Sequence, residues 1–138
     1  MLHTPRLTTI THLARREAEL LGHPEVGAEH LTLALLWEGQ GAGVHVLERM
    51  GLDPSHLAQS LRRRIVEQDD PPTAQSRADL LHLAWTEAKL LEDHHVGTEH
   101  VLLALTQESR ADLASQLLGD TRRLRRELLA EIASWRSA

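Results

Sequence analysis

Apolar residues recur along the chain at the three- and four-residue spacing of helices, and turn-forming residues separate the apolar segments. In the first half this pattern predicts four helices, over about 8–21, 28–38, 44–50 and 53–67. Gly22, Gly39 and Gly51 mark the ends of the first three, because glycine readily adopts the left-handed conformation that ends a helix. Asp53 and Pro54 suit the first positions of the fourth.

The second half of the chain repeats the first at an offset of 70 residues. Fourteen of the 26 positions between 13 and 38 are identical to their counterparts between 83 and 108, far more than chance pairing would produce. The repeated pattern predicts four further helices, over about 76–92, 98–108, 110–118 and 121–135. The segment 69–75 contains Pro71 and Pro72, which interrupt helix, and it is predicted to link the two repeats.

The duplication predicts an all-α fold of eight helices, arranged as two four-helix groups related by a pseudo-twofold axis. Repeat one covers about 1–68 and repeat two about 76–138, and each is too small to bury a sufficient core alone. We therefore expect the chain, 1–138, to form one unit with a shared core. The composition agrees, because 27 leucines stand against nine valines and isoleucines, with no phenylalanine or tyrosine.

Charge and residue usage narrow the classes of function. The formal net charge of −5 disfavours contact with a phosphate backbone, and the absence of cysteine excludes disulfides, cysteine-ligated zinc and a thiol nucleophile. No signal-peptide apolar region and no run of about 18 apolar residues occurs, so a cytoplasmic location is expected. No serine-histidine-aspartate order, paired-acid pattern or glycine-rich phosphate loop stands out, which indicates that the protein is not an enzyme.

Two corresponding strings resemble a known repeat: GHPEVGAEHLTLALLWE at 22–38 and DHHVGTEHVLLALTQE at 93–108. Both resemble the Clp N-terminal domain repeat, and the similarity covers nearly the whole chain. The resemblance implies two four-helix repeats that stand at the front of Hsp100-type Clp ATPases and receive adaptors or substrate proteins. The ATPase loop G-x-x-x-x-G-K-[ST] is absent here, so the chain is identified as a stand-alone or excised member without the AAA+ ATPase modules.

This resemblance predicts the function and its candidate residues. The expected function is a protein-interaction module of the Clp chaperone–protease system, accessory to a Clp ATPase or competing with it, without a cofactor. Some members of the family bind phosphorylated arginine at two glutamates, which correspond to Glu29 and Glu99 here. Thr98 matches the family pattern beside Glu99, whereas Ala28 replaces it in repeat one, so we expect the second site to be the better one. Alternatively, both glutamates only stabilise their helix starts.

Other features support competing interpretations. Arginine clusters at 62–64 and 122–126 could serve a DNA-associated regulatory protein, although exposed basic helix faces are ordinary. Ten histidines could serve a metal or small-ligand sensor, but no metal-ligand spacing occurs, and His30 and His100 are expected to hydrogen-bond locally. The tryptophans are expected in the core or at a groove edge; they are Trp37, Trp85 and Trp135.

Overall fold

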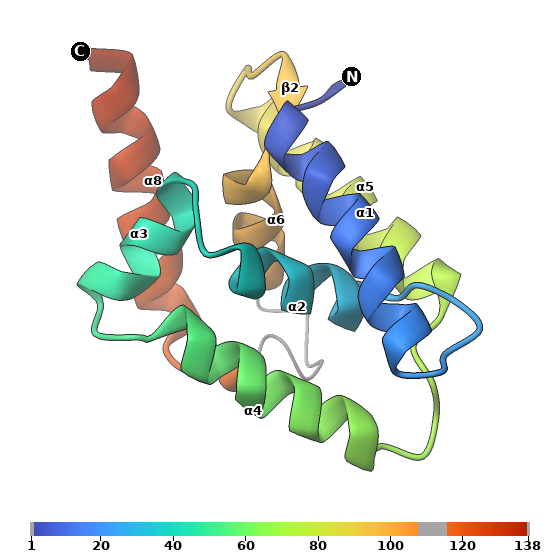
Figure 1. The fold of residues 1–138 in the computed structure, drawn as a ribbon. Coiled ribbons are helices and arrows are strands. Elements are labelled where there is room, and N and C mark those ends of the chain that lie inside the picture. Colours follow the sequence, from blue (N-terminus) through green and yellow to red (C-terminus); the bar gives the residue numbers. More distant parts are fainter. Residues whose placement is uncertain (1, 108–115, 138) are drawn as a thin grey trace.

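The computed structural model describes residues 2–107 and 116–137, and these ranges contain seven helices and two short strands (Figure 1). The helices are α1 (Pro5–Leu20), α2 (Ala28–Glu38), α3 (Ala42–Arg49), α4 (Pro54–Glu67), α5 (Ala74–Leu90), α6 (Thr98–Leu105) and α8 (Thr121–Ser137). The strands are β1 (Leu2–His3) and β2 (His95–Val96). The all-α prediction is confirmed; the helix predicted over 110–118 lies mostly outside the described residues.

The first residues of α1 and α5 differ from the prediction because two threonines cap these helices. The Thr4 hydroxyl accepts a hydrogen bond from the Leu7 N–H at 3.2 Å, and that of Thr73 accepts from the Ser76 N–H at 3.1 Å. Each hydroxyl satisfies a backbone donor that lacks a partner within the helix. As a result α1 begins three residues, and α5 two residues, before the predicted starts. Asp53 caps α4 as predicted.

The helices α1 and α5 end in the same way with different residues. The chain turns after α1 at Gly22, whose φ is +74°, and after α5 at Glu92, whose φ is +60°. A side chain in this left-handed region is disfavoured, so the pattern of glycines gives no sign of the second turn. The prediction that α5 continues to Glu92 is therefore wrong by two residues.

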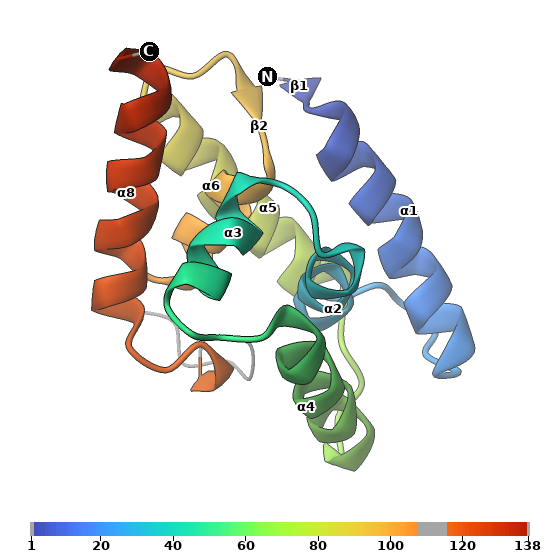
Figure 2. The same cartoon turned by 60° about the vertical axis from the view of Figure 1, so that its left-hand side comes forward.

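Helices α2 and α6 lie at the centre of the molecule, with α1, α5, α4, α3 and α8 around them (Figures 1 and 2). Almost every residue of both central helices is buried, as expected of helices that are apolar on all sides. Helix α1 packs on α2 and α5 on α6, while α2 also packs on α5 across the two halves. Buried apolar residues of both halves form one continuous core.

A two-stranded parallel ladder that the sequence does not predict joins the start of the chain to its second half. Leu2 pairs with His95 and His3 with Val96, and the Thr4 N–H donates to the Val96 carbonyl at 2.9 Å. Two-residue strands are too short to show an alternating pattern. The ladder places Thr4 beside the start of α6, and thereby brings two distant parts of the sequence together.

Corresponding acids on α1 and α5 face arginines of α4 and α8, but the two contacts differ in quality. The Glu87 side chain is only 4% exposed, and Arg125 donates to both of its oxygens at 2.9 and 3.0 Å. Gln107 donates to the same carboxylate at 3.0 Å. In the first half, Arg62 approaches Glu17 only to 3.7 Å. The buried, bidentate pair therefore fixes α8 against α5 far more specifically than its counterpart fixes α4 against α1.

None of the helices in the described ranges combines the length and the apolar run needed to cross a bilayer. The division into repeats at 1–68 and 76–138, with a linker at 69–75, stays a prediction.

Candidate functional site

The predicted glutamates occupy the same position in the two central helices. Each helix starts after a glycine N-cap, Gly27 or Gly97, and the glutamate is its second residue. The N–H of each glycine donates to Nδ1 of the histidine three residues later, at 2.9 Å in α2 and 2.8 Å in α6. The local role expected for His30 and His100 is thus confirmed. These histidines serve as the return partner of a capping box, so the glutamates are not needed for it.

The hydrogen bonds of the two histidines define their tautomers. Nδ1 accepts from a backbone N–H and cannot carry a proton, so the ring proton lies on Nε2. In α6, His100 Nε2 donates to Asp93 Oδ2 at 2.7 Å. In α2, His30 Nε2 lies 2.8 Å from His23 Nδ1 and donates to it. Burial lowers the pKa of His30 to about 4, and repulsion from His23 adds to this shift.

The Glu99 carboxylate has no hydrogen-bond donor among the described residues. His100 Nδ1 lies 3.3 Å from Glu99 Oε1, but this nitrogen already accepts from the Gly97 N–H and has no proton to donate. The Glu99 side chain is only 19% exposed, so it has also lost much of its contact with water. A partly desolvated carboxylate without a donor is an acceptor available to an incoming cationic group.

Glu99 lines a cavity of about 340 Å³ between the start of α6, the end of α8 and the segment before β2. The other lining residues are Thr4, Asp93, His94, His95, His100, Ile132, Trp135 and Arg136. Asp93 is already occupied, because it accepts from His100 and forms an ion pair with Arg136. The cavity wall thus contains the Asp93 carboxylate, which is already paired, the Glu99 carboxylate, which has no donor among the described residues, and the Arg136 guanidinium.

Thr98 does not line this cavity. Its side chain is buried beside the loop after α2, where a Cβ on Gly41 would lie 3.3 Å from Thr98 Oγ1 and 3.1 Å from Arg6 Cδ. Arg6 is held there by an ion pair with Glu38. The N–H of Thr98 has no acceptor among the described residues, but Thr98 is only 3% exposed and lies outside the cavity lining, so the structure does not bring it to the Glu99 cavity.

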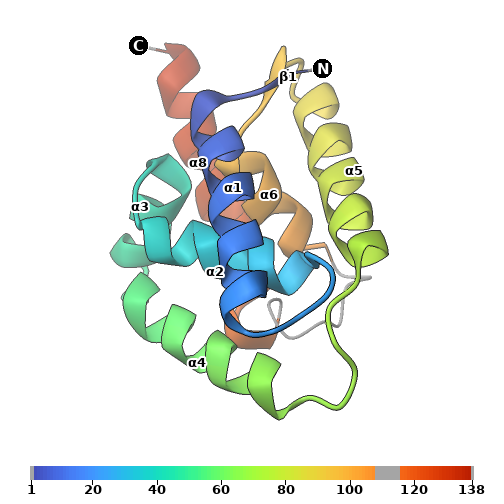
Figure 3. The same cartoon turned by 45° about the vertical axis from the view of Figure 1, so that its right-hand side comes forward.

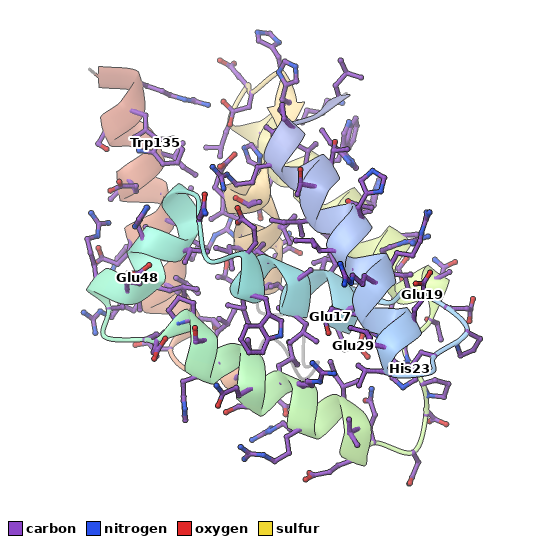
Figure 4. All side chains as sticks on the ribbon, viewed as in Figure 1. Glu17, Glu19, His23, Glu29, Glu48 and Trp135 are labelled. Atoms are coloured by element: carbon purple, nitrogen blue, oxygen red, sulfur yellow. The ribbon has the colours of Figure 1, made fainter. Side chains whose placement is uncertain are left out.

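Glu29 has different surroundings, because the chain itself covers the start of α2. The Ser76 hydroxyl accepts from the Ala28 N–H at 3.0 Å, and Gln68 Nε2 donates to Glu29 Oε2 at 3.4 Å. Pro72 lies directly against Gly27. Figure 4 shows Glu29 near His23, where α1 ends and α2 begins, far from Trp135 at the end of α8. The duplicated glutamates are therefore not equivalent.

A sequence model of the Clp repeat (R) N-terminal domain matches residues 3–121 of this chain. The chain belongs to the Clp repeat N-terminal domain family. It is 35% identical over 142 residues to a probable ATP-dependent Clp protease ATP-binding subunit of Chlamydia pneumoniae, covering 96% of this chain and 17% of that protein. It is 35% identical over 118 residues to the negative regulator of genetic competence ClpC/MecB of Bacillus subtilis, covering 83% and 15%.

Solved Clp-type N-terminal domains share the fold of this Clp repeat domain. The Hsp104 N-terminal domain from Candida albicans superposes with a TM-score of 0.73 at 15% identity, over 94% of this chain and 90% of that one. The N-terminal domain of ClpD from Arabidopsis thaliana gives 0.67 at 14% identity, over 95% and 94%. The chain spans about a sixth of the length of the curated relatives described above.

Sequence reasoning missed most of the residues around Glu99. Thr4, Asp93, Trp135 and Arg136 come from three separate segments, and only Trp135 was expected at a groove edge. At the offset of 70, Asp93 corresponds to His23. A comparison of the two repeats therefore gives no sign that an acid binds His100. No group of three or more metal-binding side chains occurs within 2–107 and 116–137.

The glycines before the two glutamates provide a first test of this geometry. An added Cβ at Gly97 would meet the mobile end of Glu99, with its Cδ at 2.9 Å, whereas at Gly27 it would meet Pro72, with its backbone Cα at 3.0 Å. We expect Gly27→Ala to lower the free energy of unfolding by about 1–3 kcal/mol because a backbone must move, and Gly97→Ala to cost less than about 1 kcal/mol. Urea unfolding measures both; equal losses would contradict the geometry.

Proposed function

We propose that this Clp repeat domain binds a segment of a client or adaptor protein through an arginine side chain held at Glu99, and that phosphorylated arginine is the preferred form. The observation that carries the proposal is the Glu99 carboxylate, largely withdrawn from water, without a donor in the described structure, and lining a cavity. A guanidinium presents several N–H donors in one plane and pairs well with such a carboxylate.

The surroundings of Glu99 also suit a phosphate group on the same ligand. The first turn of a helix presents unpaired N–H groups, and the N–H of Glu99, which lines the cavity, has no acceptor among the described residues. Arg136 adds a positive charge to the cavity wall. A phosphorylated arginine carries a guanidinium beside an anionic group, so its two charges match the acid and the donors of this site.

The contacts at the start of α2 support a single binding site, at Glu99 and not at Glu29. Ser76 occupies the Ala28 N–H, Gln68 reaches Glu29, and Pro72 covers Gly27. A ligand at Glu29 would have to displace these three contacts. A ligand at Glu99 would displace no hydrogen bond to the carboxylate, because none of the described residues donates to it. We therefore place the binding at Glu99 alone and exclude Glu29 from it.

In the cell, the proposed activity is binding without catalysis and without a cofactor. A domain of this kind would act in the cytoplasm as an accessory to a Clp ATPase or as a competitor for its clients, and a pull-down against a Clp ATPase and its substrates tests that role.

Titration calorimetry with phosphoarginine tests the site. We expect one ligand per chain, and we expect Glu99→Gln to weaken binding about 10- to 100-fold, because a charge-assisted hydrogen bond contributes roughly 1.5–3 kcal/mol. Glu29→Gln is the matched control and should change the affinity less than about twofold. Arginine-phosphorylated casein should bind and unmodified casein should bind more weakly. Unchanged affinity in Glu99→Gln would remove this residue from the site.

A further inference from the structure

Trp135 lies in the last turn of α8 (Figure 4). It lines the same cavity as Glu99. Trp135 is 42% exposed, while Ile132, one turn earlier on α8, is buried in the core. The next residue, Arg136, forms an ion pair with Asp93 in the segment before β2. Both neighbours fix the end of α8, and this places Trp135 at the cavity wall.

Trp135 is partly exposed and forms no ring–ring or cation–ring contact with the described residues, in contrast to Trp85. Trp85 stacks on His82 with ring centroids 5.8 Å apart, and Lys89 Nζ lies 4.9 Å from the centre of the Trp85 ring. Trp135 has no such ring or cation contact within the described ranges. A partly exposed aromatic face at the edge of a cavity that contains a carboxylate is suited to cover a planar cation.

The wall of this cavity already contains one pair of the kind proposed, because the Arg136 guanidinium forms an ion pair with the Asp93 carboxylate. That carboxylate and Glu99 line the same space. Trp135 and Arg136 both lie beyond residue 121, where the match to the family ends.

We infer that Trp135 is the specificity-determining residue of the Glu99 site: its indole covers the guanidinium plane of the bound arginine and makes the site select arginine over lysine. The inference rests on the proposed function of the site. Glu99 alone would attract either cation, because a carboxylate forms ion pairs both with the ammonium of lysine and with the guanidinium of arginine. A guanidinium is flat and weakly hydrated and stacks on an aromatic face, whereas an ammonium is compact and strongly hydrated.

The test compares two variants with similar starting exposure. Trp37 at the end of α2 is 40% exposed and does not line the cavity, so Trp37→Leu is the control for Trp135→Leu. We expect Trp135→Leu to weaken phosphoarginine binding about 5- to 30-fold, as the loss of a cation–π contact predicts. Trp135→Phe, which keeps an aromatic face, should lose less. Melting temperatures of all variants establish that they are folded.

Selectivity is measured with two peptides that differ only in carrying phosphoarginine or Nε-phospholysine. The natural chain should prefer the phosphoarginine peptide, and this preference should shrink in Trp135→Leu and persist in Trp37→Leu. In a Trp37→Phe/Trp85→Phe background, the fluorescence of Trp135 should change as phosphoarginine saturates the site.

The outcomes separate this inference from the function on which it rests. If the natural chain binds and Glu99→Gln loses binding, but Trp135→Leu keeps both the affinity and the preference, the inference is overturned and the proposed function stands. If the natural chain does not bind phosphoarginine, or if Glu99→Gln binds it unchanged, the proposed function is overturned and the inference with it.

Discussion

Replacing Arg125 with leucine is expected to lower the free energy of unfolding by about 3–5 kcal/mol, because it leaves a buried carboxylate without its charged partner. Arg125 supplies two of the three hydrogen bonds to Glu87, and it also donates to the Leu103 carbonyl and the Thr106 hydroxyl. Only the bond from Gln107 would remain on the carboxylate. Urea unfolding followed by circular dichroism at neutral pH measures the loss.

The first half of the chain provides the control for this prediction. Arg62 and Glu17 approach only to 3.7 Å, and 40% of the Arg62 side chain is exposed. Because Arg62 makes no hydrogen bond to Glu17, Arg62→Leu should cost less than Arg125→Leu, about 1–2 kcal/mol, which arises from leaving the buried Glu17 oxygen without a nearby cation. The double variant Glu87→Leu/Arg125→Leu should recover much of the stability lost in Arg125→Leu, since no unpaired charge remains buried. Equal losses for the two single arginine variants would contradict this account.

Acidification from pH 6.5 to pH 4 is expected to remove up to about 3 kcal/mol of stability through His30 alone. Its pKa is lowered from the ordinary 6.5 to about 4 in the folded chain, by burial first and by His23 second. The unfolded chain therefore binds a proton more readily than the folded chain in this interval. The stabilisation is complete above pH 6.5 and disappears as the pH falls towards 4.

The contribution of His30 is isolated by comparison with His30→Asn. The asparagine oxygen can accept from the Gly27 N–H as Nδ1 does, but the side chain does not titrate. Urea unfolding at several pH values should show a smaller loss of stability between pH 6.5 and 4 in His30→Asn than in the natural chain. Parallel pH profiles for the two proteins would show that protonation of His30 does not destabilise the fold.

The helices could be predicted because periodicity and capping chemistry are local. Glycine ends, the Asp53 cap and the apolar surfaces of α2 and α6 all follow from residues within a few positions of each other. The exceptions have particular causes. Glu92 adopts a left-handed conformation without being glycine, and the strands β1 and β2 are two residues long and pair across more than 90 positions.

The candidate site was less predictable than the fold, because its members meet only in three dimensions. Resemblance to the family points to both Glu29 and Glu99 and favours Glu99 only through the neighbouring Thr98, which Ala28 replaces in the first half. The difference arises from Pro72, which precedes α5, and from Ser76 in the first turn of α5. Both residues cover the start of α2. Periodicity carries no information about such a contact, nor about Trp135 reaching the cavity from the end of α8.

The segment 93–96, which precedes α6, contacts both described ends of the chain. Leu2 pairs with His95, and Arg136 pairs with Asp93, so the two ends emerge at the same end of the molecule (Figure 3). An affinity tag or fluorescent protein fused to either terminus would consequently sit at the mouth of the Glu99 cavity. A label at the exposed Val66 on α4, which does not line this cavity, would leave it unobstructed.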